Sequence, residues 1–370
     1  MSVCSSSRAF SRRLRLSAGL VAATVAVVPA LSACHGSGGG SSASSNAPAG
    51  SGAGGSGSSG GAQGGASSSP ATAPAGTEPG IVAVTKAGAL VRLDPATGAV
   101  RDTLVASGVT GDQVSVASNG TVYFATGSGC AGTIKSIPAG GGAPAVVGSG
   151  WDPAVSPDGS MLAYAAQPGA NQTCPGWDTG TPGTAFRLGI LALAGGATIK
   201  TIPQVPAGQQ ALPGPISHLS WAPDNQHVAV SIASVQDNEG WAVNIVDTKT
   251  AQSYLDGPGV SSVPVTGDPT PQQSYLREGV YMPGGNLFVS RACCGGFPPH
   301  NTSRLMWEVA PDGMMTHQVA IGFPAIDHVS LDVSSDGNWL LYLGGNDLYV
   351  SQGGARPSQV ASGLIAAAWG

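Results

Sequence analysis

The sequence predicts an all-β protein whose main body is a six-bladed β-propeller, and three observations support this prediction. One strand, turn and strand pattern recurs five times, at irregular spacings of roughly 40 to 65 residues. Six further turn sequences are interspersed with these five along the chain. The two ends of the repeat region each supply one strand of the hairpin that is missing from a set of six.

The five complete hairpins share one turn chemistry. Their turn residues tolerate positive φ, and β-branched or aromatic positions alternate with small ones on both sides, which is the signature of a β-hairpin. The turns are Ser156-Pro157-Asp158-Gly159, Ala222-Pro223-Asp224-Asn225, Met282-Pro283-Gly284-Gly285, Ser334-Ser335-Asp336-Gly337 and the weaker Ala117-Ser118-Asn119-Gly120. We expect each of them to form the inner hairpin of one blade.

Each blade also needs an outer hairpin, and six candidate turns lie in the required positions. They are Asp94 to Gly98, Ala139 to Gly142, Ala194 to Gly196, Asp247 to Thr250, Pro311 to Gly313 and Gln352 to Gly354. A first strand at Ile365 to Trp369 and a second strand at Glu78 to Val84 would form the sixth inner hairpin, which removes free sheet edges. Residues 79–370 then give just under 49 residues per blade, and seven blades is the alternative count.

The first 33 residues have the pattern of a secretory signal peptide. Four arginines precede an apolar stretch, Ser17 to Ala30, that is too short to span a bilayer. The following Leu31-Ser32-Ala33-Cys34 resembles the bacterial lipobox, which implies that Cys34 receives a diacylglycerol and becomes the first residue. An ordinary cleavage site is the alternative. Ser11 to Leu14 partly resembles a twin-arginine signal, but the general secretion route fits the following residues better.

A Gly, Ser and Ala-rich segment, residues 34–78, follows the predicted signal peptide. It has too few apolar side chains to form a core, so we expect a flexible tether. For a coil of this length the root-mean-square reach is on the order of 35–40 Å. The folded domain, residues 79–370, would therefore stand at this distance from the membrane.

The charge of the chain argues against nucleic acid as a partner. Removing the four arginines of the signal segment from 15 basic residues leaves 11 against 20 acidic ones, a formal net charge of −9. This balance repels a phosphate backbone. Charged residues make up only 9% of the chain, so Ser, Thr, Gln, Asn and Gly must form much of the surface.

The turn Ser156-Pro157-Asp158-Gly159 and its degenerate copies resemble the WD40-like repeat of TolB-type six-bladed propellers. The resemblance covers the whole region from residue 79 onward. It implies a cell-envelope protein that binds other proteins or peptides at one mouth of the central channel. We expect this chain to lack the α/β domain that precedes the TolB propeller, so the partners of TolB itself are not carried over.

The loops that enter the inner strands carry many of the few charged residues, and these loops should converge around one channel mouth. The candidate ligand-binding residues are Asp112, Trp151, Asp152, His218, Arg277, Glu278, Asp327 and His328. Polar groups from several blades around one cavity are typical of a binding site. The alternative is that these groups are solvated or tie neighbouring blades together.

The loops that join second to third strands should lie at the same mouth, and they contain four cysteines. They are Cys130, Cys174, Cys293 and Cys294. Disulfides are the expectation for an exported protein, with Cys130 and Cys174 as the first choice of pair. Cys293 and Cys294 would then form a vicinal disulfide or stay thiols, and crossed pairings remain open.

The function that these patterns favour is a lipid-anchored, non-catalytic propeller on the outer face of the bacterial cytoplasmic membrane. It would be a monomer that binds a protein, a peptide or an envelope glycan through the loop-rich mouth. Metal and cofactor motifs such as H-E-x-x-H and C-x-x-C are absent from the sequence, so we expect no metal and no cofactor. The alternative is an oxidoreductase or lyase with His218, Glu278 and His328 as acid, base or metal groups. A purely structural envelope component is a third possibility.

Overall fold

The computed structural model describes the chain from residue 80 onward, with gaps. The described residues are 80–128, 131–166, 187–203, 216–234, 240–251, 260–263, 274–293, 305–310, 315–320, 329–353 and 355–370. All regular structure within these ranges is β-strand, in six four-stranded antiparallel sheets. Within them, no helix has the length and apolar character needed to cross a membrane.

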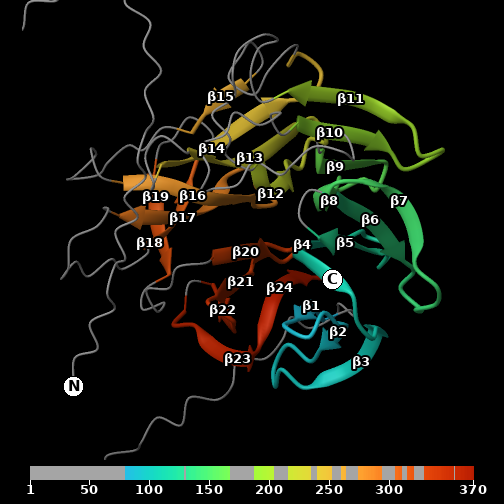
Figure 1. The fold of residues 1–370 in the computed structure, drawn as a ribbon. Coiled ribbons are helices and arrows are strands. Elements are labelled where there is room, and N and C mark those ends of the chain that lie inside the picture. The colour runs from blue at the N-terminus through green and yellow to red at the C-terminus, as the bar shows by residue number, and fades with distance from the viewer. Residues whose placement is uncertain are drawn as a thin grey trace, which may run out of the picture. The chain divides into compact units, whose positions relative to one another are not determined.

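The six sheets are the blades of a propeller, and Figure 1 shows them arranged around a common centre. Blade 1 contains β24 (Leu364–Trp369), β1 (Ile81–Thr85), β2 (Leu90–Leu93) and β3 (Val100–Val105). Blade 2 contains β4 (Val109–Val116), β5 (Val122–Ser128), β6 (Ala131–Ile137) and β7 (Ala145–Ser149). Blade 3 contains β8 (Trp151–Val155), β9 (Met161–Ala166), β10 (Arg187–Ala192) and β11 (Thr198–Pro203).

The other three blades repeat this order, so every sheet runs from an innermost to an outermost strand. Blade 4 contains β12 (Ile216–Trp221), β13 (His227–Ser234), β14 (Gly240–Asp247) and β15 (Val260–Ser262). Blade 5 contains β16 (Ser274–Tyr281), β17 (Leu287–Cys293), β18 (Leu305–Val309) and β19 (Met315–Ala320). Blade 6 contains β20 (Val329–Val333), β21 (Trp339–Gly344), β22 (Asp347–Gln352) and β23 (Ser358–Ser362).

Blade 1 closes the ring with strands from both ends of the described chain. β24 pairs antiparallel with β1, and the register runs from Ile81 opposite Trp369 to Thr85 opposite Leu364. The predicted closure is therefore confirmed. Six blades, rather than the alternative of seven, form the described ring.

The hairpin predictions are also confirmed wherever the structure describes them. All five inner hairpins are present, as β4 with β5, β8 with β9, β12 with β13, β16 with β17 and β20 with β21. The outer hairpins turn where expected in blades 1, 2 and 3, and β22 pairs with β23 beyond the turn predicted in blade 6. The turn predicted at Pro311 to Gly313 lies outside the described residues.

The hydrophobic core is divided among the interfaces between neighbouring blades. Each of the six buried clusters draws its residues from two adjacent blades. The second strands are buried on both faces, as the fully buried Phe124 of β5 and Phe288 of β17 illustrate. Because each sheet lies between two others, its apolar side chains are removed from water on both sides.

Candidate functional site

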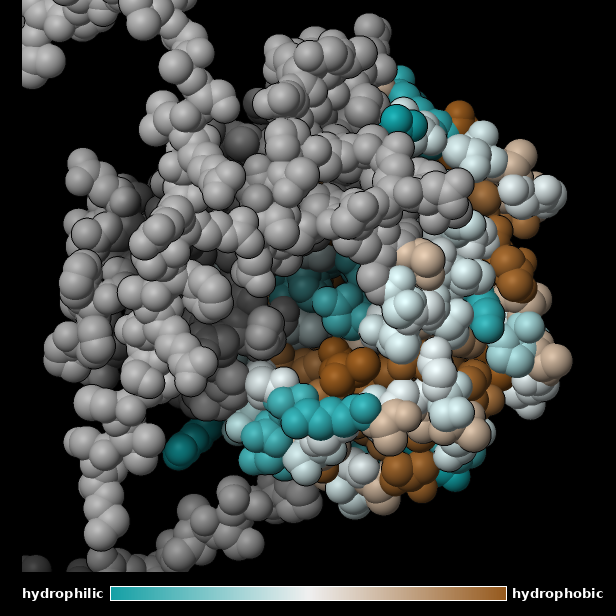
Figure 2. Space-filling model, viewed as in Figure 1, coloured by the Kyte–Doolittle hydropathy of each residue, from teal (hydrophilic) through white to brown (hydrophobic). Residues whose placement is uncertain are grey.

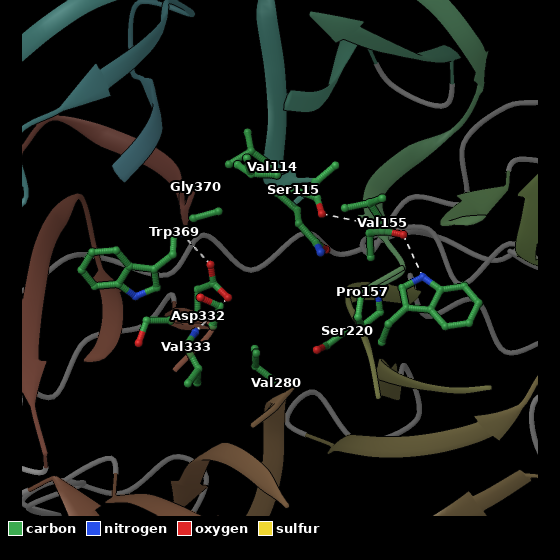
Figure 3. A pocket seen from close by; sticks show the side chains of 18 of the residues that line it. Val114, Ser115, Val155, Pro157, Ser220, Val280, Asp332, Val333, Trp369 and Gly370 are labelled. Atoms are coloured by element: carbon green, nitrogen blue, oxygen red, sulfur yellow. Dashed lines mark hydrogen bonds between the residues drawn. The ribbon is translucent and has the colours of Figure 1, made fainter. Parts of the chain in front are cut away.

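A cavity of about 940 Å³ lies at the centre of the ring, on the side of the inner-hairpin turns. Most of its lining comes from the innermost strands of all six blades and from the turns that follow them. Outer parts of blades 1 and 2 add Arg92, Arg101, Asp102 and Ala139. Figure 3 shows Val114, Ser220, Val280 and Val333 around the central space. Figure 2 shows a hollow with hydrophilic residues inside it and hydrophobic residues beside it.

The wall and rim of the cavity contain many apolar residues beside polar ones. The last residues of the inner strands supply valines and Trp221, and the exposed prolines of three turns form part of the rim. These prolines are Pro157, Pro223 and Pro283. Apolar walls with a few placed polar groups are typical of ligand pockets.

The floor of the cavity is polar and has a repeated origin in the sequence. In five of the six blades, the residue seven positions before the fourth residue of the inner-hairpin turn has a polar side chain. We call this set the polar ring, and its members are Gln113, Asp152, His218, Glu278 and Ser330. All of them except Asp152 line the cavity.

β-bulges place the polar ring within the channel. The register of the innermost strand shifts in blades 2, 3, 4 and 5, at or next to the ring position. Asp152 and His218 both have φ of 50°, a left-handed conformation that non-glycine residues adopt rarely. A bulge redirects a side chain and ends regular pairing, so these strands turn polar groups towards the centre.

Gln113 connects two blades that are not neighbours. Its Nε2 donates to the Leu219 carbonyl at 2.7 Å, and its Oε1 accepts from the Leu219 N–H at 2.9 Å. Blade 3 lies between them, and Pro153 stands there at the position equivalent to Leu219. Proline has no N–H to donate, so the side chain of Gln113 bonds to the next available backbone.

Glu278 and His218 form the ionisable part of the floor. The carboxyl of Glu278, with 2% of its side chain exposed, accepts from the Leu331 N–H at 2.8 Å. The same oxygen lies 3.3 Å from Nδ1 of His218. Glu278 therefore holds the innermost strand of blade 6 and faces the imidazole of blade 4.

Asp152 lies buried beside other acidic groups. Burial is the largest cause that raises its pKa well above the ordinary range, followed by the charge and hydrogen bond of Asp112 and the charge of Glu278. The His218 backbone N–H acts in the opposite direction. Two carboxyls that share a hydrogen bond retain a proton more firmly than isolated ones.

Asp332 is a further carboxyl in the cavity wall. Its Oδ2 accepts from the Trp369 N–H at 2.7 Å and its Oδ1 from the Val333 N–H at 2.8 Å (Figure 3). Burial raises its pKa to about 7, although both N–H groups lower it. This carboxyl changes charge near neutral pH while it binds blade 6 to blade 1.

In two other blades a serine hydroxyl accepts a hydrogen bond from a backbone N–H of the next blade, as the Asp332 carboxyl does in blade 6. Ser115 Oγ accepts from the Val155 N–H at 3.0 Å, and Ser220 Oγ accepts from the Tyr281 N–H at 2.9 Å. Each acceptor stands five residues before the fourth turn residue. These bonds satisfy backbone donors of innermost strands that have no neighbouring strand towards the channel.

The structure brings four of the eight predicted ligand-binding residues together, namely Asp112, Asp152, His218 and Glu278. Trp151 lies half-buried at the start of β8, against the backbone of Gly132. Arg277 belongs to β16, but its side chain is not described, and Asp327 and His328 lie outside the described residues.

The loop-rich mouth expected from the sequence falls mostly outside the described residues, so a site there stays a prediction. The predicted disulfides also stay predictions. Cys130, Cys174 and Cys294 are not described, and Cys293 ends β17 without a described side chain. The described cavity lies instead at the side of the turns.

The polar cavity residues that the sequence analysis missed include Gln113, Ser330 and Asp332. Their distance in sequence from the turn could have identified them. Gln113 and Ser330 stand seven residues before the fourth turn residue, and Asp332 stands five residues before it. Within the described residues, no group of three or more His, Cys, Asp or Glu side chains has the arrangement needed to hold a metal ion.

The comparison with solved structures places the fold among TolB-like propellers. The TolB of Acinetobacter baumannii aligns with a TM-score of 0.53 at 13% identity, over 78% of this chain and 65% of that one. The chain therefore spans less than two thirds of that protein. A TolB-type protein of Agrobacterium tumefaciens aligns with a TM-score of 0.47 at 14% identity, over 72% of this chain and 87% of that one. No family model and no curated protein matches the sequence.

Proposed function

We propose that this chain is a lipid-anchored binding module of the bacterial cell envelope that holds a protein, peptide or glycan partner in its central cavity. The observation that carries the proposal is the cavity of about 940 Å³, which all six innermost strands line. It combines apolar walls with a polar floor, as ligand pockets do. The TolB-like propeller fold is consistent with a binding or scaffold role.

The contacts of the floor support a preformed receptor. The side chains of Gln113 and Glu278 form hydrogen bonds with the backbone of other blades, at Leu219 and Leu331. Side chains fixed in this way lose little freedom when a ligand binds, which lowers the entropic cost of association. The floor should therefore keep its shape in the free protein.

Photo-crosslinking in living cells tests the binding proposal. A photoreactive residue at Pro283, which is exposed on the cavity rim, should capture a partner. The control position is Val146, which is 70% exposed on β7 and does not line the cavity. A crosslinked species from position 283 that is missing from position 146 supports the proposal. Identical products from both positions, or none from position 283, would count against it.

Anchoring has a separate test. A Cys34→Ser chain should move from the membrane fraction to the soluble fraction, because the lipid would have no attachment atom. Cys4→Ser is the matched control, since Cys4 lies in the segment that signal peptidase is expected to remove. If both variants fractionate with the parent protein, the lipid anchor is wrong while the cavity proposal is unaffected.

A propeller oxidoreductase or lyase is the second candidate. The observation that favours it is the pair of His218 and Glu278 in the cavity floor, with Nδ1 3.3 Å from a carboxyl oxygen. Such a pair can transfer a proton to or from a bound molecule. Metal analysis and the absorption spectrum of the purified protein, together with turnover by His218→Ala, test this candidate. Unchanged turnover in that variant would exclude this pair.

A further inference from the structure

The charges in the cavity are unevenly distributed. Near the floor and in the wall, Glu278 and Asp332 contribute carboxyls. The two arginines of the described lining are paired with acids. Arg92 lies 3.2 Å from Asp102, and Arg101 lies 2.8 Å from Asp94. The imidazole of His218 lies 3.3 Å from Glu278, and Asp332, whose pKa burial raises to about 7, is fully charged only above that pH. Because the arginines are paired with acids, these two carboxyls still give the centre of the cavity an acidic character next to its apolar residues.

We infer that the cavity binds an ammonium group of a peptide, either a lysine side chain or a free N-terminus, with the charge near Glu278 and Asp332 and the adjoining carbon atoms against the valine and proline wall. This inference rests on the proposed binding function of the same cavity and specifies its ligand.

Two physical arguments select an ammonium ligand. A carboxylate or phosphate entering the cavity would meet like charges in a partly water-excluded space, which is strongly unfavourable. An ammonium group meets opposite charges and can donate up to three hydrogen bonds. A lysine also carries a stem of four carbon atoms that suits apolar surface such as Val280 and Val333.

The experiment uses four small probes and the purified full-length chain. N-acetyl-lysine methylamide carries only a side-chain ammonium, and its neutral match is N-acetyl-norleucine methylamide. Valine methylamide carries only an N-terminal ammonium, and its neutral match is N-acetyl-valine methylamide. Dissociation constants are measured at about pH 7 by titration with NMR detection of the probe, because both amines are mainly protonated there.

The expected result is binding of at least one ammonium probe about tenfold tighter than its neutral match. A preference for the lysine probe assigns the ligand as a side chain, and a preference for the valine probe assigns it as a chain terminus. Equal binding by charged and neutral members of both pairs would overturn the inference.

Glu278→Gln tests whether the floor is responsible. The amide oxygen of Gln can still accept from the Leu331 N–H, so the substitution removes the charge and keeps a possible bond. The preference should fall to about threefold or less. Glu308→Gln is the matched control, because Glu308 lies in the same blade on β18 and does not line the cavity. This control should retain the full preference.

A second variant keeps the inference testable if Glu278→Gln does not fold. Asp332→Ser removes the other carboxyl and introduces the hydroxyl that Ser115 and Ser220 use at the equivalent positions. It should weaken the ammonium preference by roughly threefold. A preference that survives unchanged in every folded variant of Glu278 and Asp332 would place the ammonium group elsewhere and refute the inference.

Failure of this inference and failure of the proposed function can be told apart. If the probes show no charge preference while position 283 still captures a partner, the cavity binds something other than an ammonium group. If position 283 captures nothing, the result counts against a macromolecular partner in the cell, while the probe titrations alone decide the ammonium inference.

Discussion

Asp332 departs from the pattern of the equivalent positions in the other blades. Ser115 and Ser220 make the same contact to the next blade with a neutral hydroxyl. Asp332 makes it with a carboxyl whose pKa burial raises to about 7. A carboxyl that is easier to protonate in the folded chain than in the unfolded chain favours the fold at low pH. This contribution is present below about pH 4 and is lost as the pH rises through about 7.

Asp332→Ser should therefore flatten the dependence of stability on pH. The variant retains an acceptor for the Trp369 N–H and has no charge to bury. At about pH 8 we expect the free energy of unfolding of the variant to exceed that of the parent protein by on the order of 2 kcal/mol. This difference should shrink towards pH 4. Urea unfolding at several pH values measures this. A variant that is equally destabilised at every pH would contradict the assignment.

At Gly98 both the backbone conformation and the close packing against another blade favour glycine. Its φ of +67° lies in the left-handed region, and a Cβ at this position would overlap with the Val360 carbonyl of blade 6. Gly353 has a φ of +56° and has no atom within 4 Å of the position of such a Cβ. The two glycines therefore separate the cost of the conformation from the cost of the contact.

Gly98→Ala should lower the free energy of unfolding by at least about 2 kcal/mol more than Gly353→Ala does, because blades 1 and 6 must move apart to admit the methyl group. Gly353→Ala should cost only about 1 kcal/mol. Chemical denaturation of both variants measures the difference. Similar losses for the two substitutions would show that the close approach to Val360 has no energetic weight.

At the scale of the strand, the inner hairpins could be predicted because their signals are local. A turn such as Ser156 to Gly159 fixes its own geometry, since Asp158 Oδ1 accepts from the Ser156 hydroxyl and from the Ser160 N–H. The bulges that precede these turns could not be predicted. Their location depends on pairing with another strand and on side chains from other blades, as the reach of Gln113 to Leu219 shows.

Gln113→Ala tests this long-range bond between strands β4 and β12. It removes two hydrogen bonds to Leu219 and leaves the backbone of a bulge without them. The free energy of unfolding should fall by about 2–3 kcal/mol. Gln359→Ala, at an exposed position on β23, is the control and should change it by less than about 0.5 kcal/mol. A loss of the same small size for Gln113 would mean that the bond across blade 3 adds no stability.

At the scale of the whole molecule, the ring depends on contacts that no single blade contains. Carboxyl and hydroxyl groups of one innermost strand accept hydrogen bonds from N–H groups of another at the interfaces where blade 3, blade 5, blade 6 and blade 1 begin. The number and order of the blades followed from repeated turns in the sequence. The cavity lining was predicted only in part, because candidate residues were chosen by their place in the loops that enter the inner strands and not by their distance from the turn, which excluded Gln113, Ser330 and Asp332.

Removal of residues 365–370 should open the ring, since β24 would lose all but its first residue. β1 would lose one of its two partner strands and keep β2, and Asp332 would lose the Trp369 N–H. The edge contact between Trp339 and Trp369, with ring centroids 6.4 Å apart, would be lost as well. We expect the melting temperature to fall by more than about 10 °C, because several contacts of 1 kcal/mol or more are removed together. Deleting six residues from the Gly and Ser-rich segment 34–78 is the control for chain length, and its melting temperature should match that of the parent protein. Calorimetry that shows the shortened chain melting together with the parent would mean that β24 does not close the ring.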